Sequence, residues 1–211
     1  MKKCIVISDS FKGTLSSLEI CRIARQSVPR FFPGCEVVTV PVADGGEGTT
    51  DCFLDACGGR RVTAVVSDPF GAEAESFYGL LPDGTAVVEC AAAAGLPLAE
   101  GRLDPERTTT YGVGQMMAAA LDNGAKRLIL GLGGSCTNDG GCGAAAALGA
   151  ACFNEKGKTL VPVVGTLQDI ASISTEGMTE HCRGTPIRTM CVMRNPLCSS
   201  LRAHPVFRHH K

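Results

Sequence analysis

Three segments of the sequence combine polar or charged side chains with glycine, in patterns suited to binding phosphate. The first is Asp9-Ser10-Phe11-Lys12-Gly13-Thr14, which lies between an apolar run and an expected helix. Backbone N–H groups at the start of a helix attract anions, and Lys12 would add a positive charge for a phosphate or carboxylate. The alternative is that Asp9 or Thr14 only caps the helix and that Lys12 is a solvated surface charge.

The second segment is Asp44-Gly45-Gly46-Glu47-Gly48-Thr49. Two carboxylates three residues apart, in a loop with few other side chains, could bind Mg²⁺ or accept a proton from a hydroxyl. The alternative is a tight turn in which Thr49 caps the next helix. Because glycine permits a close approach of the backbone to a ligand, the glycine density favours a binding role.

The third segment, residues 131–143, holds six glycines in thirteen residues. Successive small residues let backbone N–H groups converge on an anion, whereas the alternative is a flexible turn. So many glycines lose conformational entropy on folding, which favours the ligand-binding role. The segment is not a Walker A loop, since it lacks Gly-Lys-Ser/Thr, and Cys136 replaces the third glycine of the dinucleotide fingerprint. Its polar members are Ser135, Thr137, Asn138 and Asp139.

Other candidates are weaker. Glu89 lies in the apolar run AVVECAAAAG and either faces a ligand or faces solvent at a strand end. The segment Arg107–Thr110 either caps the following helix, which we favour, or contacts an anion. The four histidines, all within residues 181–211, lack the spacing of metal ligands.

The elements that must position these segments alternate between strand and helix. Apolar, β-branched runs predict strands at Lys3–Ser8, Glu36–Val40 and Arg60–Ser67. A helix capped by Thr14 or Ser16 and closed by Pro29 and Pro33-Gly34 should follow the first strand, and Thr49–Cys57 should form the next helix. This order predicts an α/β fold with a parallel sheet and right-handed crossovers.

The alternation changes after Asp68-Pro69, where we place a domain boundary. Runs Ala74–Leu80 and Ala86–Cys90, separated by Pro82-Asp83-Gly84, predict an antiparallel hairpin. We then expect a helix at about 110–121, a strand at Arg127–Leu130 and a helix from about Cys142 to Ala151, followed by turns and short strands in 155–191.

Composition excludes several classes of protein. The net charge of the 211 residues is −1, although the six Lys and Arg of residues 181–211 have no acidic residue beside them. We therefore expect no nucleic-acid partner and no membrane partner. No two of the 12 cysteines form a C-x-x-C pair, and the apolar run after the first lysines is too short for a signal peptide. We expect reduced thiols and a cytoplasmic protein.

The motifs DSFKGTLSS (9–17), PVADGGEGT (41–49) and GLGGSCTNDGG (131–141), in this order and spacing, resemble the bacterial ATP-dependent glycerate kinase family (glycerate 2-kinase type). DPFG (68–71), ECAAAAGL (89–96) and TTTYGVG (108–114) extend the resemblance over essentially the whole chain. It implies transfer of the ATP γ-phosphoryl group to a hydroxyl of D-glycerate, with Mg²⁺ and with 2-phosphoglycerate as the expected product. The resemblance is also compatible with a homo-oligomer.

The resemblance also implies a Rossmann-like parallel-sheet lobe interrupted by a second α/β lobe with an antiparallel or mixed sheet, and an active site in the cleft between them. We assign residues 1–68 to the first lobe, 69–185 to the second, and 186–211 to a divergent return segment or tail.

Site roles follow from the chemistry of phosphoryl transfer, which depends on positioned charge. Lys12 would neutralise phosphate, Asp44 and Glu47 would hold Mg²⁺, and Asp139 or Asp9 would orient the hydroxyl. Which loop takes the nucleotide and which takes glycerate stays open. The remaining binding candidates are Ser10, Gly45, Gly46, Gly133, Gly134, Ser135, Thr137, Asn138 and Asn195.

The sequence departs from the family pattern near its end. Where the family has Cys-Asp-Val-x-Asn-Pro-Leu, residues 191–197 read CVMRNPL, so Val192 replaces a carboxylate. Family glycines are replaced by Ser199, Arg202 and Arg208, and family members continue beyond Lys211 with a segment that completes the first lobe. The second hypothesis is therefore a truncated, inactive relative that at most binds ligand. A nucleotide-binding oxidoreductase is a third, disfavoured by the missing fingerprint.

Overall fold

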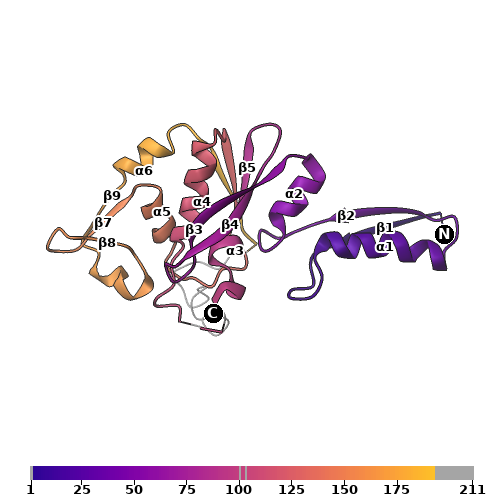
Figure 1. Ribbon diagram of the computed structural model, residues 1–211, viewed down its shortest axis with the longest axis horizontal. Helices are drawn as coiled ribbons and strands as arrows, with labels where there is room; N and C mark the ends of the chain where they lie inside the picture. Colours follow the sequence, from indigo (N-terminus) through magenta and orange to yellow (C-terminus); the bar gives the residue numbers. More distant parts are fainter. Residues whose placement is uncertain (1, 100, 103, 193–211) are drawn as a thin grey trace.

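The computed structural model describes residues 2–99, 101–102 and 104–192. Figure 1 shows an arm that projects from a larger body. The arm, residues 3–41, consists of strand β1 (Lys3–Ser8), helix α1 (Ser17–Phe31) and strand β2 (Glu36–Pro41). The body contains the elements from α2 onward. With parallel and mixed sheets and intervening helices, the predicted α/β class is confirmed.

In the arm, β1 and β2 pair in parallel and α1 packs on them. Ser16 is the N-cap of α1, one of the two caps left open by the sequence: its Oγ accepts the Glu19 N–H at 3.2 Å, and the Glu19 carboxylate accepts the Ser16 N–H at 2.9 Å. Of the two predicted closing signals, Pro33-Gly34 coincides with the end of α1 at Phe31, whereas Pro29 lies inside the helix and does not end it. A proline in the last turn removes one backbone bond without preventing the turn from forming.

The body is built on a five-stranded mixed sheet in the order β10-β6-β5-β4-β3. Strands β5, β6 and β10 are parallel, and β4 pairs antiparallel with both β5 and β3, which confirms the predicted hairpin. The bounds are β3 (Arg60–Ser67), β4 (Glu73–Leu80), β5 (Thr85–Glu89), β6 (Arg127–Gly131) and β10 (Ile187–Met190).

The expectation that residues 60–67 form the third strand of the parallel sheet was wrong. β3 pairs with β4 over its whole length, from Arg60 opposite Leu80 to Ser67 opposite Glu73. The physical reason is the turn between them, where Asp68 Oδ1 accepts the N–H groups of Phe70 and Ala72, both at 2.8 Å. A short turn brings neighbouring strands together with little loss of chain entropy, whereas parallel pairing closes a long loop. The division of the chain into two lobes stays a prediction.

The helices of the body are α2 (Thr49–Cys57), α3 (Ala91–Ala94), α4 (Tyr111–Asp122), α5 (Cys142–Ala147) and α6 (Glu176–His181). The predicted helix at 110–121 is confirmed by α4, whereas α5 ends four residues before the predicted Ala151. Gly149 follows with a φ of +107°, a conformation that stops a helix. A small antiparallel sheet adds β7 (Ala151–Phe153), β8 (Thr159–Leu160) and β9 (Ser172–Ser174), and 3₁₀ turns span Leu96–Ala99 and Val164–Asp169.

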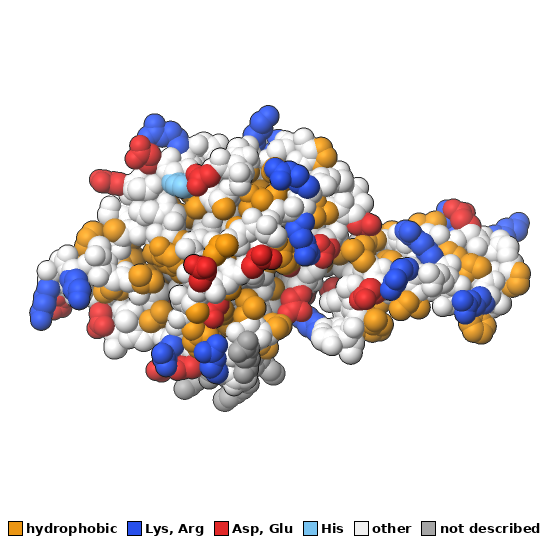
Figure 2. Space-filling model, in the orientation of Figure 1, with side chains coloured by type: hydrophobic (Ala, Val, Ile, Leu, Met, Phe, Trp, Pro, Cys, Tyr) orange, Lys and Arg blue, Asp and Glu red, His pale blue; other side chains and the backbone are white. Residues whose placement is uncertain are grey.

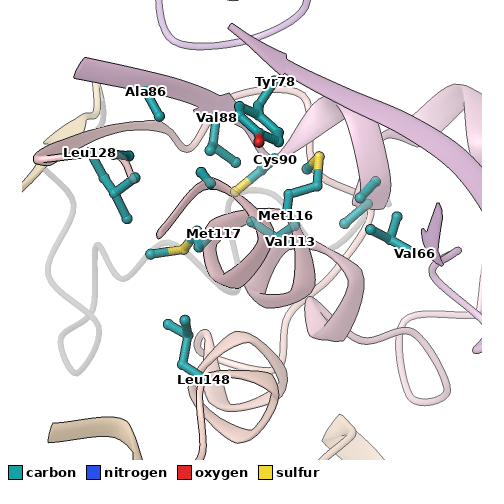
Figure 3. Packing of buried hydrophobic residues seen from close by; sticks show 14 residues of the cluster. Val66, Tyr78, Ala86, Val88, Cys90, Val113, Met116, Met117, Leu128 and Leu148 are labelled. Carbon is teal, nitrogen blue, oxygen red and sulfur yellow. The ribbon is translucent and has the colours of Figure 1, made fainter. Parts of the chain in front are cut away.

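The core lies between the five-stranded sheet and α4. Figure 3 shows Val113, Met116 and Met117 of α4 among Tyr78 and Val88 of the sheet. The opposite face of the sheet receives α2, since a Cβ placed on Gly79 would meet Thr50 Cγ2 at 2.9 Å. Both faces of β5 are therefore covered, which explains why all five of its residues are buried. Within the described ranges, no helix has the length and apolar composition that a membrane span requires.

Candidate functional site

The parallel strands of the body end at one edge of the sheet, where ligands of open α/β sheets usually bind. Gly131, the last residue of β6, is in register with Glu89 on β5 and with Met190 on β10. The second glycine-rich segment crosses this edge: Gly133 N donates to Gly45 O at 2.9 Å. Residues 44–49 and 131–134 therefore meet directly, as the placement of both segments after strands suggests.

Glycine at these positions permits the loops to touch through their backbones. A Cβ on Gly131 would collide with Gly45 O, and one on Gly133 would lie 2.8 Å from Gly46 Cα. A Cβ on Gly45 would lie 2.8 Å from Met190 O. Real Cβ atoms do not come this close to backbone, so part of the glycine density that predicts ligand binding serves loop-to-loop packing.

The first two segments share a pocket of about 300 Å³. The structure thus brings the exposed Lys12 together with Glu47, although they are distant in sequence. Asp9 and Asp44 lie beside the pocket rather than in its wall, and each accepts a nearby N–H: Ser10 N at 2.6 Å and Gly46 N at 3.0 Å. The pocket is lined by Ser10, Phe11, Lys12, Gly13, Thr14, Leu15, Ser16, Ser17, Leu18, Val42, Glu47, Gly48, Asp51 and Cys52.

Glu89 has neither of the two roles left open by the sequence. Its side chain is only 3% exposed and points to the start of α2, where Oε2 accepts the Thr50 N–H at 2.9 Å and Oε1 accepts the Gly48 N–H at 3.4 Å. The N-cap of α2 is Gly48, which has no side chain to do this. Burial raises the pKa of Glu89, and the two N–H groups oppose that increase. Glu89 therefore holds the second glycine loop against the sheet edge.

Asp139 is buried and fully engaged with protein donors. Oδ2 accepts hydrogen bonds from Thr110 N at 2.8 Å, Thr110 Oγ1 at 2.9 Å, Thr109 Oγ1 at 3.3 Å and Gly143 N at 3.1 Å, and Oδ1 accepts one from Gly141 N at 3.1 Å. These contacts tie the third segment to the start of α4. The residue predicted as catalytic thus has a structural position in this geometry.

The predicted capping role of Arg107–Thr110 is confirmed in part. Thr110 is the N-cap residue of α4, and Thr109 Oγ1 accepts the N–H of Tyr111, the first residue of the helix, at 3.2 Å, but the Thr110 side chain makes no cap bond to α4. Its Oγ1 instead accepts the Ala144 N–H at 2.9 Å, within the first turn of α5. The Thr110 hydroxyl donates to Asp139 and accepts from α5, so both of its hydrogen-bond partners come from segments distant in sequence.

The other residues of the third segment form a local turn. Ser135 Oγ lies 2.6 Å from Thr137 Oγ1 and accepts the Thr137 N–H at 3.0 Å, whereas Gly134 is exposed and Asn138 half-buried. These residues do not line the pocket of the first two segments. Asn195 lies outside the described residues, and Val192, two positions beyond β10, is exposed.

Asp44 and Glu47 suit a metal ion whose remaining coordination positions are filled by a phosphate-bearing substrate. No group of three or more His, Cys, Asp or Glu side chains in the described part of the chain could enclose a metal ion. Mg²⁺ often takes one or two protein carboxylates and fills its other positions with phosphate oxygens and water. Asp44 and Glu47, on a loop without bulky neighbours, fit such a set.

The second and third glycine-rich loops follow parallel strands and meet at one sheet edge, which is the place where α/β proteins with open sheets usually bind their ligands. The particular family follows from comparison with known sequences. The profile of the glycerate kinase family matches residues 4–211. The chain belongs to the glycerate kinase family.

Individual relatives agree with this assignment. The chain is 42% identical to glycerate kinase of Bacillus subtilis over 207 residues, and 38% identical to glycerate 2-kinase of Escherichia coli over 208 residues. Both alignments cover 97% of this chain and 54% of the relative. A crystal structure of a provisionally assigned glycerate kinase 2 from Salmonella typhimurium LT2 superposes with a TM-score of 0.84 at 36% identity, covering 100% of this chain and 57% of that one. The chain spans about half the length of the relatives it matches.

Proposed function

We propose that this chain supplies the phosphate-handling loops of a kinase that transfers the γ-phosphoryl group of ATP to a hydroxyl of D-glycerate, giving 2-phosphoglycerate. The observation that carries the proposal is the shared pocket of residues 10–18 and 47–52 in a member of the glycerate kinase family. Its wall combines a lysine, hydroxyl side chains and glycine backbone, which are groups suited to an anionic substrate. We place the reaction in the cytoplasm.

Lys12 would bind the negative charge of the substrates. Its ammonium group is on an exposed loop at the pocket, with Ser10 and Gly13 beside it. A positive charge there stabilises the phosphate oxygens in the ground state and in the transition state, where their charge is redistributed.

Asp44 and Glu47 would hold Mg²⁺, which, when bound, neutralises phosphate charge. The Asp44 side chain is held by its bond to Gly46 N, and Glu47 is exposed at the pocket wall. Glu89 fixes the loop that carries both carboxylates through Gly48 and Thr50.

Asp9 is better placed than Asp139 to orient the acceptor hydroxyl. Asp139 already accepts five hydrogen bonds in a buried site. Asp9 is half-buried, immediately precedes the pocket-lining Ser10 and uses Oδ1 for the Ser10 N–H. A carboxylate within reach of a hydroxyl can accept its proton as the oxygen attacks phosphorus.

The alternative is a chain that binds ligand without turning it over. It is favoured by Val192, since the resemblance to the family predicts a carboxylate at this position. In that case ATP or D-glycerate would protect the folded protein against heat while no product forms.

A coupled assay with purified protein, ATP, Mg²⁺ and D-glycerate separates the two functions. We expect turnover, with Lys12→Ala or Asp44→Ala lowering kcat/KM at least about 100-fold because each removes a charge at the phosphates. The matched control is Lys156→Ala, an exposed lysine at a different surface pocket, which should retain the full rate. Folded protein without turnover, but with ligand-dependent thermal protection, would establish the alternative. Full activity of Lys12→Ala would refute the site assignment.

A further inference from the structure

Strand β3 lies at one end of the five-stranded sheet, and its outer edge has no neighbouring strand among the described residues. The strand is eight residues long and pairs with β4 in a continuous register. Natural proteins usually protect an open edge with a short strand, a bulge, a proline or charged side chains. Of these devices β3 has only charged side chains, at its first two residues, Arg60 and Arg61.

Alternate residues of an edge strand turn their backbone groups toward the neighbouring strand and toward the open edge. Asp68 N–H, directly after β3, donates to Ala72 O at 2.6 Å and therefore faces the side of β4. Ser67 N–H donates instead to the Gln115 side chain of α4 at 2.7 Å. The odd-numbered residues of β3 thus direct their N–H and C=O groups to the edge. Those before Ser67 are Arg61, Thr63 and Val65.

The side chains at this edge are exposed and suited to strand pairing. Val65 is 66% exposed and Thr63 is exposed, and β-branched side chains pack well across paired strands. Arg61 is held over the face of the sheet: its Nη2 donates to both carboxylate oxygens of Asp51, at 2.8 and 2.9 Å, and its guanidinium lies 3.7 Å from the centre of the Phe77 ring. The Arg61 side chain therefore does not protect the edge.

The two ends of β3 differ in charge. Arg60 is exposed at the start of the strand, whereas the other end is followed by Asp68 and, at the start of β4, by the exposed Glu73 and Glu75. None of these four side chains has an ion-pair partner among the described residues. Figure 2 shows exposed side chains of both charge signs, with hydrophobic ones between them, over the part of the body where Figure 1 draws β3 and β4.

We propose that β3 pairs with β3 of a second copy of this chain, in antiparallel orientation about a two-fold axis at Thr63. In this register Thr63 faces Thr63 of the second copy, and Arg61 faces its Val65. Each facing pair exchanges two hydrogen bonds, so about six bonds join the two five-stranded sheets into one. Arg60 then lies diagonally opposite Asp68 of the second copy, a separation that a long side chain can span.

Self-complementarity is the reason for choosing a second copy as the partner. A two-fold interface uses the same surface on both molecules, so that surface must match itself. Antiparallel pairing brings the basic end of each β3 beside the acidic end of the other, whereas two parallel copies would place like charges together. The proposal does not rest on the proposed reaction, since assembly can be measured without ATP or glycerate.

Sedimentation equilibrium of the 211-residue chain tests the proposal. At concentrations up to about 0.1 mM we expect an equilibrium between monomer and dimer. Thr63→Pro should raise the dissociation constant of the dimer at least about 10-fold, because it removes an N–H group at the edge without touching the bonds to β4. Val65→Lys should have a similar effect, since lysine on an edge opposes pairing. Ile173→Lys, at an isoleucine of similar exposure (56%) on β9, is the matched control and should leave the dimer unchanged.

Arg60→Glu is a further variant that leaves the backbone of the strand unchanged. It should weaken the dimer about 3-fold or more, because it places like charges at both junctions of the strands. Circular dichroism and thermal unfolding would establish that each variant is folded. A chain that is monomeric at the highest concentration would overturn the proposal. So would a dimer that tolerates both Thr63→Pro and Val65→Lys, or one that Ile173→Lys weakens as much as they do.

Discussion

The arm and the body have similar local structure but very different burial. Both contain parallel strands of β-branched residues with a helix packed against them. Val88 of β5 is 0% exposed, since α4 and α2 cover the two faces of its sheet, whereas Ile7 of β1 is 65% exposed. The hydrophobic pattern of the sequence and backbone hydrogen bonding are therefore enough to form a β-α-β unit. How deeply its apolar side chains are buried depends on the layers that other parts of a protein pack against it.

The site lies where the two regions meet. The pocket takes residues 10–18 from the arm side and 47–52 from the loop and helix that enter the body. The second loop is held on its body side by Glu89 and by the backbone of Gly131 and Gly133. Ligand binding there should depend on both regions, whereas stability should depend mainly on the body.

The largest expected effect is that of Tyr78→Ala in the body. Tyr78 is fully buried, and its Oη accepts from Asn123 Nδ2 at 2.7 Å and donates to Ala119 O at 3.3 Å. Removing the ring should lower the free energy of unfolding by about 3–5 kcal/mol, since it leaves a cavity and unpaired polar groups. Ile7→Ala in the arm should change it by only about 0.5 kcal/mol, because the side chain is exposed. Urea unfolding measures the free energy of unfolding of both variants. Equal losses would show that the arm and the body do not differ in burial as described.

A smaller loss is expected for Gly131→Ala at the sheet edge. The added Cβ would collide with Gly45 O, so the second loop must shift away from β6. We expect a loss of about 1–3 kcal/mol in the free energy of unfolding, as for other overpacked sites.

Gly165→Ala is the matched control, because the nearest atom to its added Cβ, Glu106 O, is 3.3 Å away. Thermal unfolding of the two variants measures the difference. If Gly131→Ala were as stable as the control, the close packing of the two loops would not contribute to the free energy of unfolding.

The smallest effect concerns Glu89 and the dependence of stability on pH. Burial raises the pKa of Glu89 in the folded state above its ordinary value of about 4.5, against the opposing Thr50 and Gly48 N–H groups, and nearby Asp51 adds to the increase. The folded protein then binds more protons than the unfolded chain in the window above that value. The contribution of this group to stability is fully present below the ordinary pKa and is lost as pH rises through the folded-state pKa.

Glu89→Gln should lack this component, so its Tm should fall less than that of the unsubstituted protein as pH rises from about 4.5 to about 8. Differential scanning calorimetry over that range measures it, with Glu155→Gln, at an exposed glutamate, as control. Parallel Tm curves for the two variants would show that Glu89 does not titrate differently on folding.

Much of the local structure could be predicted from the sequence. The hairpin at residues 73–89 and helix α4 follow from turn residues and periodicity, and the cap of α1 was narrowed to Thr14 or Ser16, of which the structure selects Ser16. The partner of β3 could not, because alternating strands and helices do not determine which strands pair. The turn at Asp68 decided it.

For the site, the sequence identified the loops but not the use of each side chain. Lys12 and Glu47 share a pocket, as a kinase site would need. The sequence predicts catalysis for Asp139 and contact with ligand or solvent for Glu89. Besides near neighbours in the third segment, Asp139 accepts a hydrogen bond from Thr110, 29 residues away, and Glu89 accepts one from Thr50, 39 residues away. Such partners have no signature in the local pattern.

Amide hydrogen exchange of this chain alone tests the difference between arm and body most directly. If the sheet of the arm is covered by α1 on one face only, the amides of β1 and β2 should exchange at least about 100-fold faster than those of β5 and β6, because fewer buried contacts oppose their opening. Equal protection of the four strands would contradict the account, since it would mean that the arm is stabilised as fully as the body.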